Sequence, residues 1–157
     1  QKVLDLCCGS GDLTEIVLDR KLKGLEVKAV DFSSEMLEIA KKRFNSCSEV
    51  EFLQADALDL PFADAYFDRV IISFGLRNLK SIDTGYQEIK RVLKPSGSMV
   101  NLDFGKPNFF LVRIMFNVYF EFIVPVVGKL FNNYSEYHYL SDSIKLFPSP
   151  EAALLLA

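Results

Sequence analysis

The sequence is poor in the residues that build metal sites, disulfide frameworks and nucleic-acid surfaces. Its 157 residues include one histidine, three cysteines and no tryptophan. Cys7 and Cys8 are adjacent and Cys47 stands alone, so their spacing matches neither a zinc motif nor a set of disulfides. We expect small buried residues in a reducing compartment, and no metal. Basic residues form no cluster and the net charge is −3, so we predict no nucleic-acid partner.

The remaining composition is that of a globular domain with an apolar core. Hydrophobic residues make up 50% of the chain, and 14 residues are phenylalanine. At this length one domain can bury a sizeable core. The chain starts without methionine, directly in a predicted strand, and stops within the apolar run 154–157, so we expect both ends to be cut. Nothing in it resembles a signal or transit peptide.

Residues 3–11 are the most informative stretch of the chain. An apolar run with an acid at Asp5 leads into the turn Gly9-Ser10-Gly11, and the helix-compatible segment 12–22 follows. Glycine allows positive φ and lets a ligand lie against bare backbone. Free N–H groups at a helix start favour an anion, either phosphate or carboxylate. The charge of Asp5 disfavours a diphosphate and favours an ammonium group, although an ordinary strand-to-helix turn has the same Gly-x-Gly pattern.

Three further strands are predicted, and each ends in small or acidic residues. These strands and the residues that close them are 27–31 with Asp31, 50–55 with Asp56-Ala57, and 67–73 with Ser73. An acid about 20 residues after the glycine turn is where a dinucleotide-binding fold places a carboxylate on ribose hydroxyls. In open parallel sheets the ligand crevice lies at the carboxyl ends of the strands. Ser33 can cap the helix that follows the second strand, with Glu35 in its first turn.

The alternation of strands and helices continues beyond the fourth strand. Ile82 and Ile89 lie at helical spacing, the run Lys94-Pro95-Ser96-Gly97 stops this helix, and a fifth strand is predicted over 98–104. Alternation of this kind predicts an α/β fold with a doubly wound, mostly parallel sheet.

Two sets of motifs carry a family resemblance. The pattern Asp-x-Cys-x-Gly-x-Gly, with the later acids and Ser73, resembles the class I S-adenosylmethionine-dependent methyltransferases. A second set resembles the ubiquinone/menaquinone C-methyltransferase family: Gly75-Leu76-Arg77-Asn78, Arg91-Val92-Leu93-Lys94-Pro95, Leu102-Asp103-Phe104-Gly105-Lys106-Pro107 and Tyr137-x-Tyr139-Leu140-x-x-Ser143-Ile144. Residues 5–13 and 31–35 are most similar to its phylloquinone branch, found in cyanobacteria and plastids. The resemblance implies a Rossmann-like sheet and S-adenosyl-L-methionine as the cofactor.

The methionine end of that cofactor is zwitterionic, and the first turn offers a partner for each charge. Asp5 can receive the ammonium group, while the turn formed by Gly9, Ser10 and Gly11 receives the carboxylate. The alternative for Asp5 is a solvated acid at the end of a strand.

The nucleoside end would be held by the next two strand ends. Asp31 can accept two hydrogen bonds from the ribose diol, and its alternative role is to cap a helix. Asp56 can accept from the adenine amine and the Ala57 amide can donate to a ring nitrogen, with Phe32 and Met36 on the two faces of the base. The resemblance places cofactor contacts at Ser10, Asp31, Asp56, Ala57 and Ser73.

Methyl transfer from a sulfonium needs positioned reactants and exclusion of water. A C-methyltransferase also needs an electron-rich carbon, which a hydroquinone supplies best when deprotonated, so a group should stabilise that charge. The resemblance supports Arg77 in this role with Asn78 orienting it, and a surface or ion-paired arginine is the alternative. His138 and Asp103 are candidate bases, although a lone histidine is more often structural.

The chain divides into a cofactor-binding core over 1–105, a Phe-rich segment over 106–146, and the start of a further helix over 147–157. A helix over 108–129 is almost wholly apolar. An ordinary buried helix is one interpretation of this segment. The other, which the resemblance favours, is a lid over a prenyl tail that touches the bilayer through residues 108–131. A single stripe of polar residues would form at Arg113, Asn117 and Glu121, and its charges disfavour a membrane span.

The resemblance implies C-methylation of a prenylated demethylnaphthoquinol, which completes phylloquinone or menaquinone. Alternatives are the benzoquinol step toward ubiquinone, another small-molecule class I methyltransferase, and a non-catalytic binding subunit with an exposed apolar surface. A nicotinamide dehydrogenase is disfavoured because Thr14 stands where its third glycine is expected. The expected partner is the quinol, with a homo-oligomer left open. The expected location is the cytoplasm or membrane surface of a bacterium, or a plastid in a eukaryote.

Overall fold

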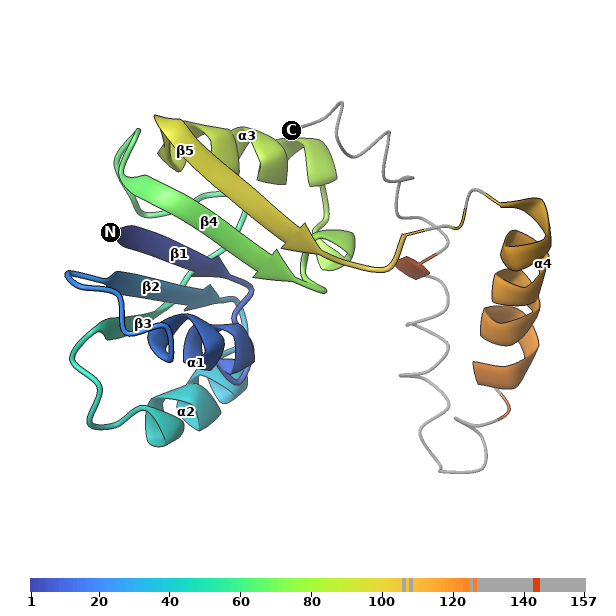
Figure 1. Cartoon of the computed structure of the whole chain (residues 1–157), viewed down its shortest axis with the longest axis horizontal. Helices are drawn as coiled ribbons and strands as arrows, with labels where there is room; N and C mark the ends of the chain where they lie inside the picture. Colours follow the sequence, from blue (N-terminus) through green and yellow to red (C-terminus); the bar gives the residue numbers. More distant parts are fainter. Residues whose placement is uncertain (106, 108, 125, 127–142, 145–157) are drawn as a thin grey trace. The chain divides into compact units, whose positions relative to one another are not determined.

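The computed structural model describes residues 1–105, 107, 109–124, 126, 143 and 144. The chain forms two compact units, Gln1–Asp103 and Phe104–Ala157. The first unit is an α/β sandwich around a single sheet (Figure 1), and the described part of the second unit centres on a short apolar helix.

All five strands of the first unit run parallel, in the order β3-β2-β1-β4-β5. Their bounds are β1 Lys2–Leu6, β2 Glu26–Asp31, β3 Val50–Gln54, β4 Phe67–Ser73 and β5 Leu93–Leu102. The strand order reverses at the centre, since β2 and β3 lie on one side of β1 whereas β4 and β5 lie on the other. Open α/β sheets bind ligands at such a switch point, outside the carboxyl ends of the strands. The predicted doubly wound parallel sheet is therefore confirmed.

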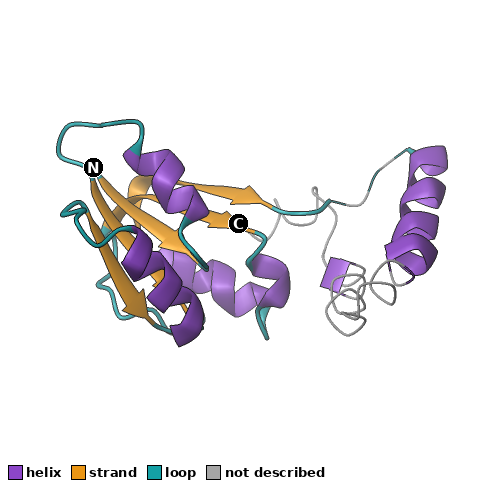
Figure 2. Ribbon diagram, turned by 90° about the horizontal axis from the view of Figure 1, so that it is seen from below, coloured by secondary structure: helices purple, strands orange, loops and turns teal. Residues whose placement is uncertain are grey.

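The helices begin where the sequence provides caps. Their bounds are α1 Asp12–Leu18, α2 Ser34–Arg43, the 3₁₀ helix η1 Leu76–Asn78 and α3 Ile82–Val92. Ser33 caps α2 by accepting a hydrogen bond from the Met36 N–H at 3.2 Å, and Ser81 caps α3 in the same way. Right-handed crossovers place α1 and α2 on one face of the sheet and α3 on the other, and Figure 2 shows helices on both sides of the strands.

The core of the first unit lies between the sheet and these helices. Fully buried strand residues include Leu4, Leu6, Val27, Val30, Val70 and Ile72. Phe67, at the start of β4, is fully buried and packs edge to face against Phe62 and Tyr66, with ring centroids 4.9 Å apart in each case. Two interior strands, β1 and β4, are buried or half-buried at every position, as expected for strands covered on both faces, whereas the edge strands β3 and β5 also carry exposed residues.

Two predicted boundaries were wrong by several residues, whereas those of β2 and β3 differ by a single residue. The first helix ends at Leu18 rather than at residue 22, because the backbone turns through positive φ at Lys21 and Gly24. The fifth strand is Leu93–Leu102 rather than 98–104, because Leu93 already pairs with Phe67 before the ladder resumes further along. The intervening residues form an irregularity in which the chain folds closely on itself; a Cβ on Gly97 would lie 2.9 Å from the Lys94 carbonyl oxygen.

In the second unit, helix α4 (Phe110–Val118) continues directly into a π-helical turn, η2 (Tyr119–Ile123). Phe120, Val124 and Ile144 form a small buried cluster with the partly buried Phe104 and Phe116. The regular α-helix predicted over 108–129 is thus interrupted by a π turn after Val118.

None of the residues of α4 is buried, whereas Phe120 and Val124 in the same predicted segment are buried, so the interpretation as an ordinary buried helix stays a prediction. Its exposed apolar residues include Phe110, Leu111, Val112, Ile114, Met115 and Val118. Within the described ranges, no helix is long and apolar enough to cross a membrane. Three predictions lie outside the described residues: His138, residues 137–142 of the Tyr-x-Tyr-Leu motif, and the helix over 147–157.

Candidate active site

A cavity of about 370 Å³ lies at the carboxyl ends of four neighbouring strands, at the switch point of the sheet. It is lined by Leu6 and Cys7 after β1, residues 30–32 after β2, residues 55–58 after β3, and residues 73–75 and 78–80 after β4. A cavity of this size and position is typical of a site for a small molecule or cofactor.

The cavity gathers about half of the predicted site residues. Its lining includes Asp31, Phe32, Asp56, Ala57, Ser73 and Asn78. Asp5, Gly9, Ser10, Gly11 and Arg77 are not part of the lining. Cys7, Leu58, Leu79 and Lys80 also line it and were not predicted. Their place directly beside the predicted strand ends is the signal that could have identified them.

The glycine turn has the backbone geometry that the sequence predicts. Gly9 and Gly11 have φ of +54° and +88°, in the left-handed region that favours glycine. The Gly9 N–H donates to Asp31 Oδ2 at 2.8 Å, and the Gly11 N–H donates to the Cys8 carbonyl at 2.9 Å. The N–H groups of both glycines are therefore used in hydrogen bonds that stabilise the turn. A Cβ on Gly11 would lie 2.7 Å from the Phe44 ring, whereas one on Gly9 would meet nothing within 4 Å.

Asp31 joins the turn after β1 to the start of α2. Its Oδ2 accepts from the Gly9 N–H, and its Oδ1 accepts from the Ser33 N–H at 2.9 Å. The capping alternative is thus part of what Asp31 does. The side chain still lines the cavity, and each carboxylate oxygen can accept a second hydrogen bond, so contact with a ligand's hydroxyls remains open to it.

Asp5 is a buried acid and not the solvated strand-end acid of the alternative interpretation. The residue is 1% exposed, and Thr14 Oγ1 donates to its Oδ2 at 2.6 Å. Its Oδ1 has no hydrogen-bond partner within the described part of the chain. Burial raises the pKa of Asp5 to about 6, with a smaller contribution from the charge of Asp31, whereas the bonds from Thr14 act in the opposite direction.

The end of β3 presents a polar edge to the cavity. Asp56 is exposed, and its Oδ1 accepts from the Leu58 N–H at 2.9 Å, so the carboxylate is oriented by its own loop. The Ala57 residue is buried beneath it. Phe32, across the cavity lining, is 72% exposed and offers a free ring face, and Met36 is also exposed.

Cys7, directly after β1, lines the cavity and lies close to Gly75 in the loop after β4. A Cβ on Gly75 would lie 2.6 Å from the Cys7 Cβ, so glycine is needed for the two loops to approach. Burial, together with the charges of Asp31, Asp5 and Asp56, raises the pKa of the Cys7 thiol to about 12. The thiol is therefore neutral and a poor nucleophile.

Arg77 lies in η1 and forms an ion pair with Asp103, directly after β5. Arg77 Nη1 is 2.5 Å from Asp103 Oδ1, and the two side chains are 10% and 1% exposed. The guanidinium also lies 5.3 Å from the Phe74 ring centroid. Asn78 Nδ2 donates to the Phe74 carbonyl at 3.0 Å. Arg77 is thus ion-paired, as one of the two interpretations of the sequence predicted. Its partner is Asp103, which the sequence suggested as a candidate base.

A parallel sheet of this order, with a glycine turn after β1 and carboxylates after β2 and β3 around one cavity, defines a Rossmann-like domain of the class I methyltransferase type. The chain belongs to the ubiE/COQ5 methyltransferase family, whose model matches residues 1–155. This membership confirms the family resemblance found in the motifs, and the phylloquinone branch stays a prediction.

Curated relatives cover nearly all of the chain. A protein of Bacillus licheniformis named demethylmenaquinone methyltransferase is 42% identical over 146 residues, which are 92% of this chain and 63% of that protein. A Thermus thermophilus protein of the same name is 41% identical over 154 residues, which are 97% of this chain and 70% of that protein. The chain therefore spans less than two thirds of the length of the Bacillus licheniformis protein.

Solved structures show the same fold. A SAM-dependent methyltransferase from Aquifex aeolicus has a TM-score of 0.63 and is 25% identical, over 69% of this chain and 59% of that one. A protein from Pyrococcus horikoshii has a TM-score of 0.58 and is 38% identical, over 64% and 47% of the two chains. The predicted family and fold are confirmed, and a solved SAM-dependent methyltransferase is among the structures that share this fold.

The two glycines of the turn should respond differently to alanine. Gly9→Ala meets no neighbouring atom, so only its positive φ should cost stability, about 1–2 kcal/mol. Gly11→Ala adds a clash with the Phe44 ring, and overpacking of this kind typically costs about 1–3 kcal/mol more. Urea unfolding of both variants measures the difference, and equal losses would contradict the packing described for Gly11.

The contribution of Asp5 to the free energy of unfolding should decrease as pH rises, whereas that of an acid in an ion pair increases. Its pKa of about 6 exceeds the unfolded value of 3.8, so the folded state binds more protons between these values. Its contribution to stability therefore falls as pH rises through this window, by about 3 kcal/mol. Asp5→Asn carries no charge, so we expect its unfolding free energy relative to wild type to rise over the same window, measured by urea unfolding at several pH values.

Asp68 is the control for the sign of this effect. The Lys94 ammonium group holds the pKa of Asp68 below its usual value, so its contribution is present at neutral pH and is lost as pH falls. Asp68→Asn should therefore lose stability relative to wild type as pH rises. If the difference between Asp5→Asn and wild type does not vary with pH, the buried acid described here is wrong.

Proposed function

We propose that the protein is an S-adenosylmethionine-dependent C-methyltransferase that methylates a ring carbon of a prenylated demethylnaphthoquinol. The observation that carries this proposal is the cavity at the switch point, where carboxylates follow two adjacent strands in a chain of the ubiE/COQ5 family. The names of relatives at 41–42% identity support a naphthoquinol as the ring.

The residues present fit the cofactor. Asp31 would accept from the ribose hydroxyls, since its carboxylate lines the cavity. Asp56 and the Ala57 amide would bind the adenine edge, and the exposed ring of Phe32 would cover one face of the base. The turn at Ser10 would receive the methionine carboxylate.

The buried Asp5 would complement the ammonium group of the methionine end through its unbonded oxygen. Arrival of a cation beside Asp5 favours its ionised form, so binding is coupled to loss of a proton near pH 6. The carboxylates at the strand ends also suit a positively charged ligand better than a diphosphate. This electrostatic preference separates the proposed cofactor from a dinucleotide.

The bound cofactor supplies a methyl group on a sulfonium, a leaving group that needs no acid catalyst. The protein must therefore orient the quinol carbon, exclude water, and stabilise the charge of the deprotonated hydroquinone. Arg77 is proposed for this charge, because its guanidinium is fixed by Asp103 and by the Phe74 ring. Asn78, which lines the cavity, is the neighbouring polar group on the same short helix.

The substrate's tail is proposed to lie along apolar surface of the second unit. Helix α4 exposes several large apolar side chains, among them Phe110, Leu111 and Met115. Surface of this kind suits an isoprenoid chain and contact with the membrane that holds it, which supports a peripheral location for a cytoplasmic enzyme. Phylloquinone and menaquinone precursors share the ring and differ in this tail.

Turnover on reduced demethylnaphthoquinone and demethylbenzoquinone analogues tests the proposed substrate in the full-length protein. We expect methylation of the naphthoquinol and little of the benzoquinol. Methylation of the benzoquinol alone would establish the ubiquinone alternative. Binding of S-adenosylmethionine without turnover on either ring would contradict the quinol assignment and favour another methyltransferase or a binding subunit.

Arg77 should affect the chemical step more than cofactor binding. Arg77→Met removes the positive charge, so kcat should fall by about 100-fold or more, the typical effect of losing one charge-stabilising donor. Cofactor affinity should stay close to that of wild type. Because loss of one partner of a buried pair is destabilising by about 3–5 kcal/mol, Arg77→Lys is the matched variant that keeps the charge, and it should recover part of kcat. Wild-type kcat in Arg77→Met would overturn this role.

A further inference from the structure

The adenine edge, Asp56-Ala57, is the beginning of a long loop that has no helix or strand of its own. The loop runs from the end of β3 at Gln54 to the start of β4 at Phe67. Its residues 55–58 line the cavity, so their position decides where a base can bind. Loops of this length need side-chain contacts to hold one conformation. At its start this loop is held by the Ala55 N–H, which donates to the Asp31 carbonyl at 3.2 Å, and further along it is held by side chains of helix α3.

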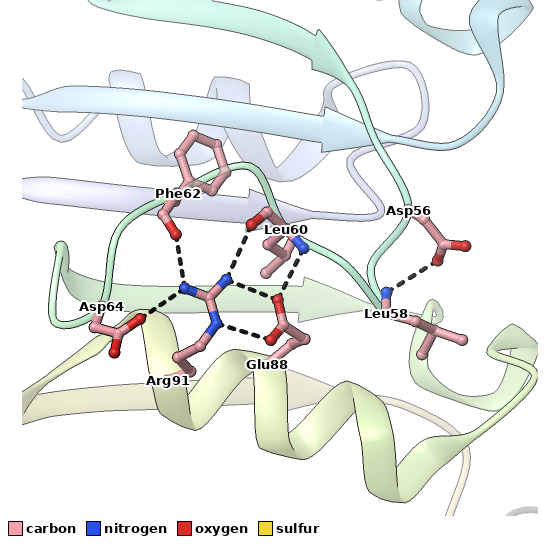
Figure 3. A network of polar contacts seen from close by, with 7 residues as sticks. All are labelled: Asp56, Leu58, Leu60, Phe62, Asp64, Glu88 and Arg91. Atoms are coloured by element: carbon pink, nitrogen blue, oxygen red, sulfur yellow. Dashed lines mark hydrogen bonds and ion pairs between the residues drawn. The ribbon is translucent and has the colours of Figure 1, made fainter.

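Arg91, in the last turn of α3, makes a set of hydrogen bonds to this loop (Figure 3). Its Nη1 donates to the Phe62 carbonyl at 2.7 Å and to Asp64 Oδ1 at 2.9 Å, and its Nη2 donates to the Leu60 carbonyl at 2.9 Å. A planar guanidinium can satisfy several acceptors in fixed directions at once, which lysine cannot.

Glu88, one turn earlier in α3, completes the arrangement. It accepts from Arg91 Nε and Nη2 through its two oxygens, both at 2.8 Å. Its Oε2 also accepts from the Leu60 N–H at 2.8 Å. The backbone of Leu60 is thus held at both its N–H and its carbonyl, and its side chain is buried. Arginine lowers the pKa of Glu88, which keeps this carboxylate ionised.

Leu60 lies four positions after Asp56, and hydrogen bonds within residues 56–59 connect this part of the loop to Asp56. The Asp59 N–H donates to the Asp56 carbonyl at 3.1 Å, and the Leu58 N–H donates to Asp56 Oδ1. Displacement of Leu60 would therefore move or release Asp56. Arg91 itself is not part of the cavity lining, so any effect on a ligand must pass through the loop.

We propose that Arg91 and Glu88 are positioning residues that set the specificity of the site for adenine. They would do so by holding the backbone of Leu60, and through it the position of Asp56-Ala57. The proposal rests on the proposed function, since it takes an adenosyl ligand in the cavity as given. The Arg-Val-Leu-Lys-Pro motif thereby acquires a role in base selection, although none of its residues lines the cavity.

The test is the ratio of two dissociation constants, for S-inosylhomocysteine and S-adenosylhomocysteine. Inosine replaces the amine donor by a carbonyl, which faces the Asp56 carboxylate, and carries an N–H where the Ala57 amide would donate. The wild-type protein should prefer the adenosyl ligand by about tenfold or more, the effect of about one lost charge-assisted hydrogen bond. An unfolded fraction weakens both affinities equally, so the ratio reports positioning and not stability.

Arg91→Met and Glu88→Gln should reduce this ratio toward one, and Arg91→Lys, which folds more readily, should reduce it in part. Lys94→Met is the matched control, because Lys94 pairs with Asp68 at the opposite end of the strands and has similar exposure, 38% against 31% for Arg91. Its ratio should equal that of wild type. Asp56→Asn should change the ratio directly.

Each outcome has a separate meaning. An unchanged ratio in all Arg91 and Glu88 variants, with a changed ratio in Asp56→Asn, overturns the positioning role alone. Failure of the wild-type protein to bind S-adenosylhomocysteine overturns the proposed function and this inference with it. An equal change in Lys94→Met would show that any lost ion pair has the same effect, which also contradicts the proposal.

Discussion

The carboxylate of Asp31 is the interaction on which the arrangement of the site depends. It accepts from the N–H of Gly9 in the turn after β1 and from the N–H of Ser33 at the cap of α2. One side chain therefore fixes the spacing between the first two strand ends. On the other side of β1, the contact of Cys7 with Gly75 fixes the spacing to the end of β4. The cavity is the space that these two constraints leave open at the switch point of the sheet.

The charges around this space favour a cationic ligand. Asp5, Asp31 and Asp56 lie in or just after three adjacent strands, and their charges add to the effect of burial in raising the pKa of the Cys7 thiol. Burial also raises the pKa of Asp5. A fraction of Asp5 is therefore protonated near pH 6, and binding of a cation beside it would favour release of that proton. Arg77, with its charge balanced by Asp103, lies at the end of the fourth and fifth strands. The carboxylates of Asp5, Asp31 and Asp56 and the Arg77–Asp103 pair thus lie at the ends of different strands.

Much of the fold could be predicted from local sequence. Ser33 as a cap, the end of β4 at Ser73 and the left-handed glycines follow from short-range rules, and the structure confirms them. The start of β5 could not be predicted, because it depends on a partner distant in sequence, whereas the end of α1 precedes a local turn with positive φ at Lys21 and Gly24. Leu93 joins the sheet only because Phe67 lies beside it.

The sequence predicted many of the residues that form the site, but it did not predict most of the contacts between them. The residues that line the cavity were found from their positions after strands, which is a topological rule. The burial of Asp5 under Thr14 and the pairing of Arg77 with Asp103 depend on tertiary packing that spacing does not encode. The role of Arg91 could not be predicted for the same reason, since β4, η1 and most of α3 lie between it and Leu60 in the sequence.

The crystal structure of the full-length protein with S-adenosylhomocysteine is the most direct measurement. The adenine should lie against Asp56-Ala57, the ribose hydroxyls on Asp31, and the amino-acid end toward the glycine turn above Asp5. The sulfur should then lie near the ends of β1 and β4. A ligand bound elsewhere, or bound in this cavity with its ends exchanged, would contradict the assignment of these residues.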